Sequence, residues 1–373
     1  MSDRPARGLL RLPDGLEPYP SEPSDEALAE SLGLSLDQLL RFDMNTLGGG
    51  PLPAVASALA TYDARRIVEY GDQAYRRLRA AIQAATGAPA HRIIPGAGGD
   101  ELIRLVTGLV VAPGDAVTIP TPTFGMFAVE ARLAGGQVVE VPRHDPGQQQ
   151  DVRAIRAATE DSGSRLVWLC SPNNPTGDAY AIEAIARLAE GLDAVVVVDT
   201  VYQELAEVSA GAEPEALSLL PSQERLPNLV ILRSLAKAYG LAGARVGYLV
   251  VPDALAARFE AARLPLAIGG PSEAAALGAL SDLPAARARL AEIVAQRERL
   301  AAALGAAGWR VLPSHANFLL VRPLDAAATA AALLRQGLAV REYPGGPLLG
   351  WLRITARSAA ENDRLLAALG IDG

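Results

Sequence analysis

Short hydrophobic runs alternate with amphipathic segments through the middle of the chain. Runs rich in β-branched residues predict buried strands at 116–119, 166–170, 195–199, 229–232 and 246–251. Between these runs, apolar residues recur at helical spacing, as in Leu102, Ile103 and Val106. Strands that alternate with helices predict an α/β fold, in which helices cover both faces of a mostly parallel sheet.

The pattern changes after about residue 260. A long amphipathic helix is expected at 284–304. The segments that follow predict strands at 317–321, 338–341 and 351–355, a helix that begins near Asp325, and a last helix at 359–369. We therefore expect a Pro-rich, irregular N-terminal arm over residues 1–45, a large domain over 46–260 and a smaller α+β domain over 261–373.

Composition narrows the class of protein. Half of the 373 residues are hydrophobic and the formal net charge is −8. These values favour a folded chain and argue against nucleic acid or an anionic membrane as the main partner. Cys170 is the single cysteine and the three histidines lie far apart, so we expect neither a disulfide framework nor a metal site. Residues 1–15 lack an apolar signal core and no apolar run reaches about 18 residues, so we expect a cytoplasmic protein without membrane spans.

Lysine occurs once, at position 237, whereas arginine occurs 33 times. Arginine replaces lysine on many surfaces, but a guanidinium stays protonated and cannot serve where a neutral, nucleophilic amine is needed. Lys237 is therefore a candidate nucleophile. The alternative is the chance survival of one surface lysine.

A glycine-rich segment at 96–101 runs directly into an apolar helix. Backbone N–H groups at such a helix start bind anions. The segment does not match the G-x-G-x-x-G pattern of dinucleotide sites, and no convincing strand is expected before it. An ordinary tight loop is therefore an equal alternative.

Two polar segments follow predicted strands. Asn173 and Asn174 come shortly after the strand at 166–170, and Asp199 ends the strand at 195–199. In α/β sheets, ligands bind at the carboxyl ends of the strands. Turn formation by the asparagines and simple capping by Asp199 are the alternatives. In the functional interpretation, a carboxylate at the end of a buried strand must meet a cation.

A third segment places Lys237 between Ser234 and Arg245. An amine reacts with an aldehyde, a hydroxyl and a guanidinium hold a phosphate, and the Asp199 carboxylate suits a protonated pyridine nitrogen. The cofactor that needs all three functions is pyridoxal 5′-phosphate (PLP).

From about Leu16 onward, the chain resembles the PLP-dependent, fold-type I, class I and II aminotransferases, and most of all the histidinol-phosphate aminotransferase family. The motifs that carry this resemblance are, in chain order, Leu16-Glu17-Pro18-Tyr19, Asn45, Tyr70, Gly98-Gly99-Asp100-Glu101, Pro122-Thr123-Phe124, 172–177, Asp199 with Tyr202, Ser234 with Lys237 and Arg245, Asn317-Phe318 and Leu352-Arg353-Ile354-Thr355. The resemblance implies a large domain with a mostly parallel seven-stranded sheet sandwiched by helices, and a smaller α+β domain.

The resemblance also implies the roles of the cofactor site. Lys237 would bond covalently to the cofactor aldehyde, Asp199 would pair with the ring nitrogen, and Asn174 and Tyr202 would bind the ring's phenolic oxygen. Lys237, Asp199 and Tyr202 are thus the expected catalytic residues. The other residues expected to bind the cofactor are Gly99, Asp100, Glu101, Phe124, Ser234 and Arg245, with Tyr70 from a second subunit.

By the same resemblance, the substrate side involves residues from the arm and the small domain. The expected substrate-binding residues are Tyr19, Asn45, Asn174, Arg341 and Arg353. The contribution of Tyr70 to the other subunit's site implies a homodimer with shared active sites.

The expected reaction is a ping-pong transfer of an amino group between histidinol phosphate, or a related amine, and 2-oxoglutarate. Residues 32–42 and 357–362 also resemble threonine-phosphate decarboxylases of the same fold, so a PLP lyase is one alternative. An aminotransferase for another, aromatic amino acid is a second. A binding module without catalysis is a third, which the intact Lys237 and Asp199 argue against.

Overall fold

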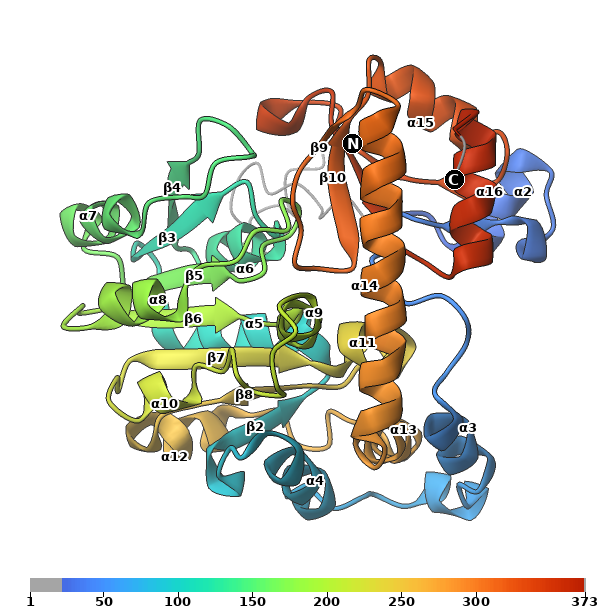
Figure 1. The fold of residues 1–373 in the computed structure, drawn as a ribbon. Coiled ribbons are helices and arrows are strands. Elements are labelled where there is room, and N and C mark those ends of the chain that lie inside the picture. The colour runs from blue at the N-terminus through green and yellow to red at the C-terminus, as the bar shows by residue number, and fades with distance from the viewer. Residues whose placement is uncertain (1–21, 372–373) are drawn as a thin grey trace, which may run out of the picture.

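A seven-stranded sheet forms the centre of the larger part of the protein in the computed structural model, which describes residues 22–371 (Figure 1). Its strands follow in spatial order as β2 (Ile93–Gly96), β8 (Gly247–Val250), β7 (Leu229–Ser234), β6 (Val195–Asp199), β5 (Leu166–Cys170), β3 (Ala116–Thr121) and β4 (Gln137–Pro142). Strand β8 is antiparallel to both of its neighbours, and the other neighbouring pairs are parallel. The α/β class and the mostly parallel sheet are therefore confirmed.

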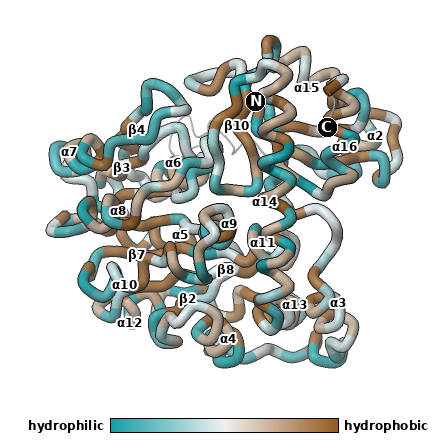
Figure 2. Tube along the Cα trace, in the orientation of Figure 1, coloured by the Kyte–Doolittle hydropathy of each residue, from teal (hydrophilic) through white to brown (hydrophobic). Residues whose placement is uncertain are grey.

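The inner strands β5, β6 and β7 are buried on both faces of the sheet, because they are hydrophobic at nearly every position. Successive strand side chains point to opposite faces. Val196 and Val198 belong to a core that includes Ile155 of α7 (Val152–Ser162) and Ile185 of α8 (Ile182–Ala189). Val197 belongs to the core on the other face, with residues of α5 (Gly98–Val110) and α6 (Met126–Leu133). Hydrophobic positions gather along inner strands such as β7 and β10 in Figure 2.

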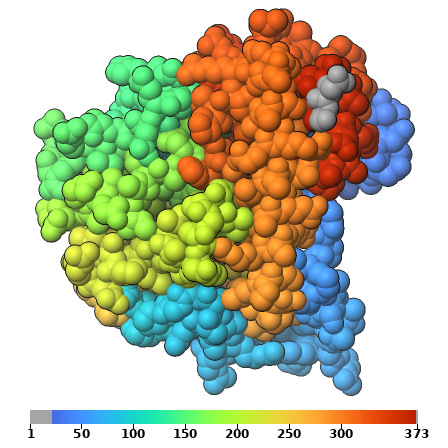
Figure 3. All heavy atoms as spheres, viewed as in Figure 1, coloured from blue at the N-terminus to red at the C-terminus, as the bar shows by residue number. Residues whose placement is uncertain are grey.

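Further helices complete the larger part and connect it to the smaller one. They are α3 (Pro53–Ala60), α4 (Arg76–Thr86), α9 (Gln203–Ser209), α10 (Leu220–Gln223), α11 (Leu235–Ala238), α12 (Asp253–Ala262), α13 (Gly270–Leu280) and α14 (Leu283–Ala306). Helix α13 packs against α3 and α4, and α14 contacts α9 of the larger part and α16 (Ala359–Leu369) of the smaller part. Figure 3 shows α14 in orange along the surface between the two parts.

The smaller part is an α+β unit around an antiparallel sheet. The sheet has the spatial order β12 (Arg341–Glu342), β13 (Leu352–Thr355), β10 (Phe318–Arg322) and β9 (Arg310–Val311). Beside it lie α2 (Asp25–Leu32), α15 (Ala326–Leu334), α16 and a parallel pair of β1 (Leu40–Arg41) with β11 (Leu338–Ala339). The short 3₁₀ helices are η1 (Leu36–Gln38), η2 (Ala64–Val68), η3 (Ala90–Arg92), η4 (Ala242–Ala244) and η5 (Gly346–Leu348).

Three sequence-based expectations about local structure were wrong. A strand, β2, does precede the glycine-rich segment; its Pro95 made it hard to recognise, and proline is tolerated because β2 is an edge strand. Strand β4, also at an edge, was not predicted. The arm is not irregular over 25–41, because Ser24 caps α2 and Gly33 ends it in the left-handed conformation.

The domain boundaries at residues 45 and 260 stay predictions. No helix within residues 22–371 is both long and apolar enough to cross a membrane.

Candidate active site

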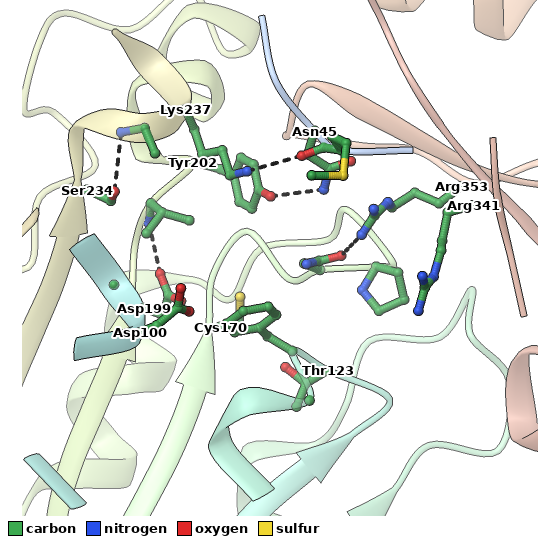
Figure 4. A pocket seen from close by; sticks show the side chains of 18 of the residues that line it. Asn45, Asp100, Thr123, Cys170, Asp199, Tyr202, Ser234, Lys237, Arg341 and Arg353 are labelled. Atoms are coloured by element: carbon green, nitrogen blue, oxygen red, sulfur yellow. Dashed lines mark hydrogen bonds between the residues drawn. The ribbon is translucent and has the colours of Figure 1, made fainter. Parts of the chain in front are cut away.

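A pocket of about 820 Å³ lies at the carboxyl ends of β5, β6 and β7. Cys170, Asp199 and Ser234, the last residues of these strands, all line it. Arg341 and Arg353 of the smaller part line it as well. Figure 4 shows these two arginines together at one end of the pocket, away from Ser234 and Lys237. The site is thus at the edge where α/β sheets bind ligands, and both parts of the chain build it.

The single lysine lies inside this pocket. Lys237 is on the short helix α11, and its Nζ donates to the backbone oxygen of Met44 at 3.4 Å. Burial, followed by the positive charges of Arg353 and Arg245, lowers the pKa of the Lys237 amine to about 8. A larger fraction of this amine is therefore neutral and nucleophilic near pH 7 than of an ordinary lysine.

Asp199 is a buried carboxylate that lines the pocket. It ends β6 and accepts a hydrogen bond from the Val201 backbone N–H at 3.1 Å. Burial raises the pKa of Asp199 to about 7, because this hydrogen bond and the charge of Lys237 only partly offset desolvation. A carboxylate in this position is stabilised by a bound cation, which a protonated ring nitrogen provides.

Donors for an anion converge at the start of α5. The first N–H groups of this helix, from Gly98 to Asp100, have no acceptors within the helix. Arg245 lies beside them, with its Nη2 at 2.8 Å from Oδ2 of Asp100. A Cβ atom on Gly98, which has φ +85°, would lie 2.8 Å from Nη2 of Arg245. The left-handed φ favours glycine at this position, and a side chain there would also displace the guanidinium of Arg245. With Ser234, these donors fit the phosphate of PLP.

Not every expected cofactor residue reaches the pocket. Glu101 is not among the residues that line it; its carboxylate accepts from the Ala97 backbone N–H at 3.1 Å and holds the loop before α5. Phe124 does line the pocket and packs edge-to-face on Phe127, with ring centroids 5.7 Å apart. Tyr70 does not line its own chain's pocket and is 90% exposed.

Hydrogen bonds link the two parts of the chain across the pocket. Nδ2 of Asn45 donates to the Tyr202 hydroxyl at 3.0 Å, which leaves the proton of that hydroxyl for another acceptor. Nη1 of Arg353 donates to Oδ1 of Asn174 at 2.7 Å, and Nη2 donates to the backbone oxygen of Asp43. The contact with Arg353 turns the Asn174 amide so that its N–H₂ group is available as a donor.

The substrate end of the pocket is strongly positive. Arg341 and Arg353 are register partners on β12 and β13. Nε of Arg353 is buried without a hydrogen-bond partner among the described residues, and an anionic ligand would satisfy it. Tyr19, which was expected here, lies outside the described residues.

Some pocket residues were missed from the sequence. Glu22 forms an ion pair with Arg341, while Arg132 of α6 adds a guanidinium to those of Arg245, Arg341 and Arg353, and Tyr343 adds a phenol. Nothing in their local sequence distinguishes them. Thr123, which donates to Oδ1 of Asn173 at 2.7 Å, carried a signal because it belongs to a recognised motif. Within residues 22–371, no three His, Cys, Asp or Glu side chains gather as metal ligands.

Comparisons with known proteins agree with this geometry. The model of the family "Aminotransferase class I and II" matches residues 37–369. The chain is 38% identical to a histidinol-phosphate aminotransferase of Roseiflexus castenholzii, covering 97% of each chain, and 43% identical to one of Xanthomonas campestris, covering 80% of this chain and 83% of the relative. It is similar to the crystal structure of histidinol-phosphate aminotransferase from Sinorhizobium meliloti in complex with pyridoxal-5′-phosphate, with a TM-score of 0.84, 29% identity and 94% coverage of both chains.

The family match spans most of the chain. The pocket contains the amine of Lys237, the buried carboxylate of Asp199 and a group of anion-binding donors at the start of α5. The chain therefore belongs to the class I and II aminotransferase family, with a type I fold, and is a PLP-dependent transaminase.

Proposed function

We propose that this enzyme transfers an amino group between histidinol phosphate and 2-oxoglutarate. The observation that carries the proposal is the pair of guanidiniums, Arg341 and Arg353, opposite each other in one pocket. Two like charges in one small site repel each other unless an anion lies between them. A phosphate dianion balances both charges, whereas a single carboxylate balances one.

The cofactor residues divide the chemical work. When bound, PLP supplies an aldehyde carbon and an electron-withdrawing ring. Lys237 Nζ would hold the cofactor through that aldehyde carbon, and the free Lys237 amine would be the base that takes the proton from the substrate carbon that bears the amine. Asp199 would keep a proton on the ring nitrogen, and Tyr202 and Asn174 would bind the phenolic oxygen. Proton transfer by a positioned group of this kind contributes about 10²–10⁴-fold to the rate.

Arg353 serves both half-reactions in this proposal. Its planar guanidinium offers the same fork of donors to a phosphate and to a carboxylate. Arg341 adds the second positive charge that the phosphate requires. Asn45 would meet the substrate beside Tyr202, to which it is hydrogen-bonded.

The active sites are shared within a homodimer in this proposal. Tyr70 is 90% exposed and follows the exposed Ile67 and Val68, which are 65% and 81% exposed. Such a run of apolar side chains on a surface is typical of a protein interface. Tyr70 would bind the cofactor phosphate of the partner subunit. The cytoplasmic location expected from the sequence stays a prediction.

The experiment is a substrate panel read as cofactor absorbance in single turnovers. Histidinol phosphate should convert the cofactor to its amine form with the largest kcat/KM, and 2-oxoglutarate should restore the aldehyde form. Threonine phosphate and aromatic amino acids represent the alternatives. Release of carbon dioxide from threonine phosphate, without a keto product from histidinol phosphate, would reject the proposal in favour of a lyase.

A further inference from the structure

A carboxylate of the chain itself lies against one of the two substrate-binding guanidiniums. Glu22 pairs with Nη1 of Arg341; the two side chains are 24% and 22% exposed, and both line the pocket. Arg353, in contrast, donates to a neutral amide and a backbone oxygen. The two guanidiniums therefore have different surroundings, although they face each other across neighbouring strands.

Glu22, Arg341 and Arg353 together can have two net charges, depending on the position of the Glu22 side chain. With Glu22 on Arg341, the trio carries a net charge of +1, which a monoanionic carboxylate on Arg353 balances. With Glu22 turned away, the two guanidiniums carry +2, which a phosphate dianion balances. In the proposed reaction, one substrate brings a phosphate to this end of the pocket and the other brings a carboxylate, so each charge state of the trio suits one half-reaction.

The backbone that follows Glu22 is fixed by hydrogen bonds, but Glu22 itself lies before the first helix. Nη1 of Arg41 donates to the backbone oxygen of Pro23 at 3.0 Å and to Oδ1 of Asp25 at 2.5 Å. Helix α2 begins at Asp25, with Ser24 as its cap. Glu22 can thus leave Arg341 by side-chain rotation, without unfolding of the elements around it.

We propose that Glu22 is a displaceable counter-ion of Arg341 that leaves when a phosphate-bearing substrate binds and stays when a monocarboxylate binds. The inference rests on the proposed function, because it assigns the phosphate of that substrate to Arg341. Glu22 is a specificity-determining residue in this scheme: it lowers the affinity for free phosphate esters and leaves available the charge state that suits a carboxylate.

The size of the effect follows from the strength of a partly exposed ion pair. If the ion pair contributes about 1 kcal/mol of stability, Glu22 is away from Arg341 in about one sixth of the molecules. Removal of the Glu22 charge should therefore raise the affinity for a phosphate ester about sixfold. A ligand that does not displace Glu22 should gain nothing.

The test uses the PLP-loaded enzyme, so that the cofactor's own phosphate site is filled. Calorimetric titration with ethyl phosphate and with propionate should show about sixfold tighter binding of ethyl phosphate to Glu22→Gln, and unchanged binding of propionate. Glu22→Ala, which also lacks the carboxylate, should behave in the same way. Glu30→Gln removes an exposed charge of the same segment and should change neither ligand.

Two results would overturn the inference. One is binding of ethyl phosphate that is unchanged or weaker in Glu22→Gln; the other is an equal gain for propionate and ethyl phosphate. In an Arg341→Ala background, the Glu22→Gln change should have no effect, because its partner is absent. Turnover of histidinol phosphate by the unmodified enzyme is measured separately, so failure of the proposed function is distinguished from failure of this inference.

Discussion

Arg341 and Arg353 are register partners on the antiparallel strands β12 and β13, and both side chains line the same pocket. Residues directly opposite each other in such a pair have Cβ atoms about 4.5–5.5 Å apart, and like charges there are destabilising. A fold gains nothing from this pairing by itself. Glu22 offsets one of the two positive charges by pairing with Arg341, and a ligand that carries negative charge would offset the other.

Replacement of Arg341 should separate the two kinds of substrate. Loss of one charge-assisted hydrogen bond costs about 1.5–3 kcal/mol, so Arg341→Ala should lower kcat/KM for histidinol phosphate about 10- to 150-fold. Glutamate, if held by Arg353 alone, should lose much less. Steady-state kinetics with both substrates measures the difference, and Arg335→Ala, an exposed arginine on α15's C-terminal side, is the control. Equal losses for both substrates would contradict this division.

Lys237 should be the one residue that bonds to the cofactor. Borohydride reduction of the holoenzyme, followed by peptide mass spectrometry, should place the cofactor on the peptide that contains Lys237. Lys237→Arg should neither be labelled nor transaminate, because a guanidinium remains protonated. A label on the N-terminal amine would show that the covalent link is elsewhere.

Arg353 should control the basicity of Lys237 in the apoenzyme. Burial comes first, and the positive charge of Arg353 second, among the causes that lower the pKa of Lys237 to about 8. Removal of a like charge makes protonation easier, so Arg353→Ala should raise this pKa. Reductive ¹³C-methylation gives one side-chain signal, because the chain has a single lysine. An NMR titration of that signal that is unchanged by Arg353→Ala would disprove the coupling.

The buried Asp199 carboxylate should destabilise the folded apoenzyme at neutral pH, where it loses its proton. Burial raises the pKa of Asp199 from 3.8 to about 7 in the folded chain, so the folded state binds the proton more strongly than the unfolded state. The stability that this group contributes is fully present below pH 3.8 and is lost as the pH rises through 7. Asp199→Asn should therefore gain stability relative to the parent apoenzyme between these pH values, by up to about 4 kcal/mol.

Urea unfolding of the two apoenzymes at pH 5 and pH 8 measures this difference. Asp193→Asn serves as the control, because Asp193 is fully exposed and lies just before β6. A gain for Asp199→Asn that does not increase with pH would show that Asp199 is stabilised by a cation of the apoenzyme itself.

Tyr70 should act in the partner's active site. A mixture of Tyr70→Phe and Lys237→Ala chains forms heterodimers in which both changes fall in one site, so the other site is intact. At equal mixing, about one quarter of the parent activity should return. Each parent variant alone should be impaired, Tyr70→Phe by about tenfold through loss of a hydrogen bond to phosphate. No recovery in the mixture, or a monomer by light scattering, would exclude shared sites.

Much of the central fold could be predicted from the sequence for local reasons. The strands at 166–170 and 195–199 were found at their observed bounds, and so was the last helix at 359–369. The two strands are recognisable because both faces of the sheet are covered there, which makes nearly every residue hydrophobic. The helix is recognisable because one of its faces is apolar. The chemistry of Lys237 was visible for a different reason, since no other residue supplies a neutral amine of that kind.

The edge strands and the arm depended on the tertiary structure. Strand β4 lies at an edge of the seven-stranded sheet and most of its residues are not buried, so they carry little of the pattern that burial imposes. Strand β2, at the other edge, is buried, but it has four residues and two of them are Pro95 and Gly96. Strand β1 has two residues and exists because β11 pairs with it. No local periodicity predicts an element whose partner is far along the chain.

The sequence by itself determined the α/β architecture and singled out Lys237 as the candidate reactive amine, because both follow from residue type and short-range pattern. The residues expected to bind the cofactor came from the resemblance to the family and stay predictions. Only the tertiary structure decided that Glu22 meets Arg341, that Arg341 faces Arg353, and that Glu101 turns away from the pocket. The physical reason is that charge pairing depends on distance in space, and residues at opposite ends of the chain come within reach of each other only after the sheets and helices have packed.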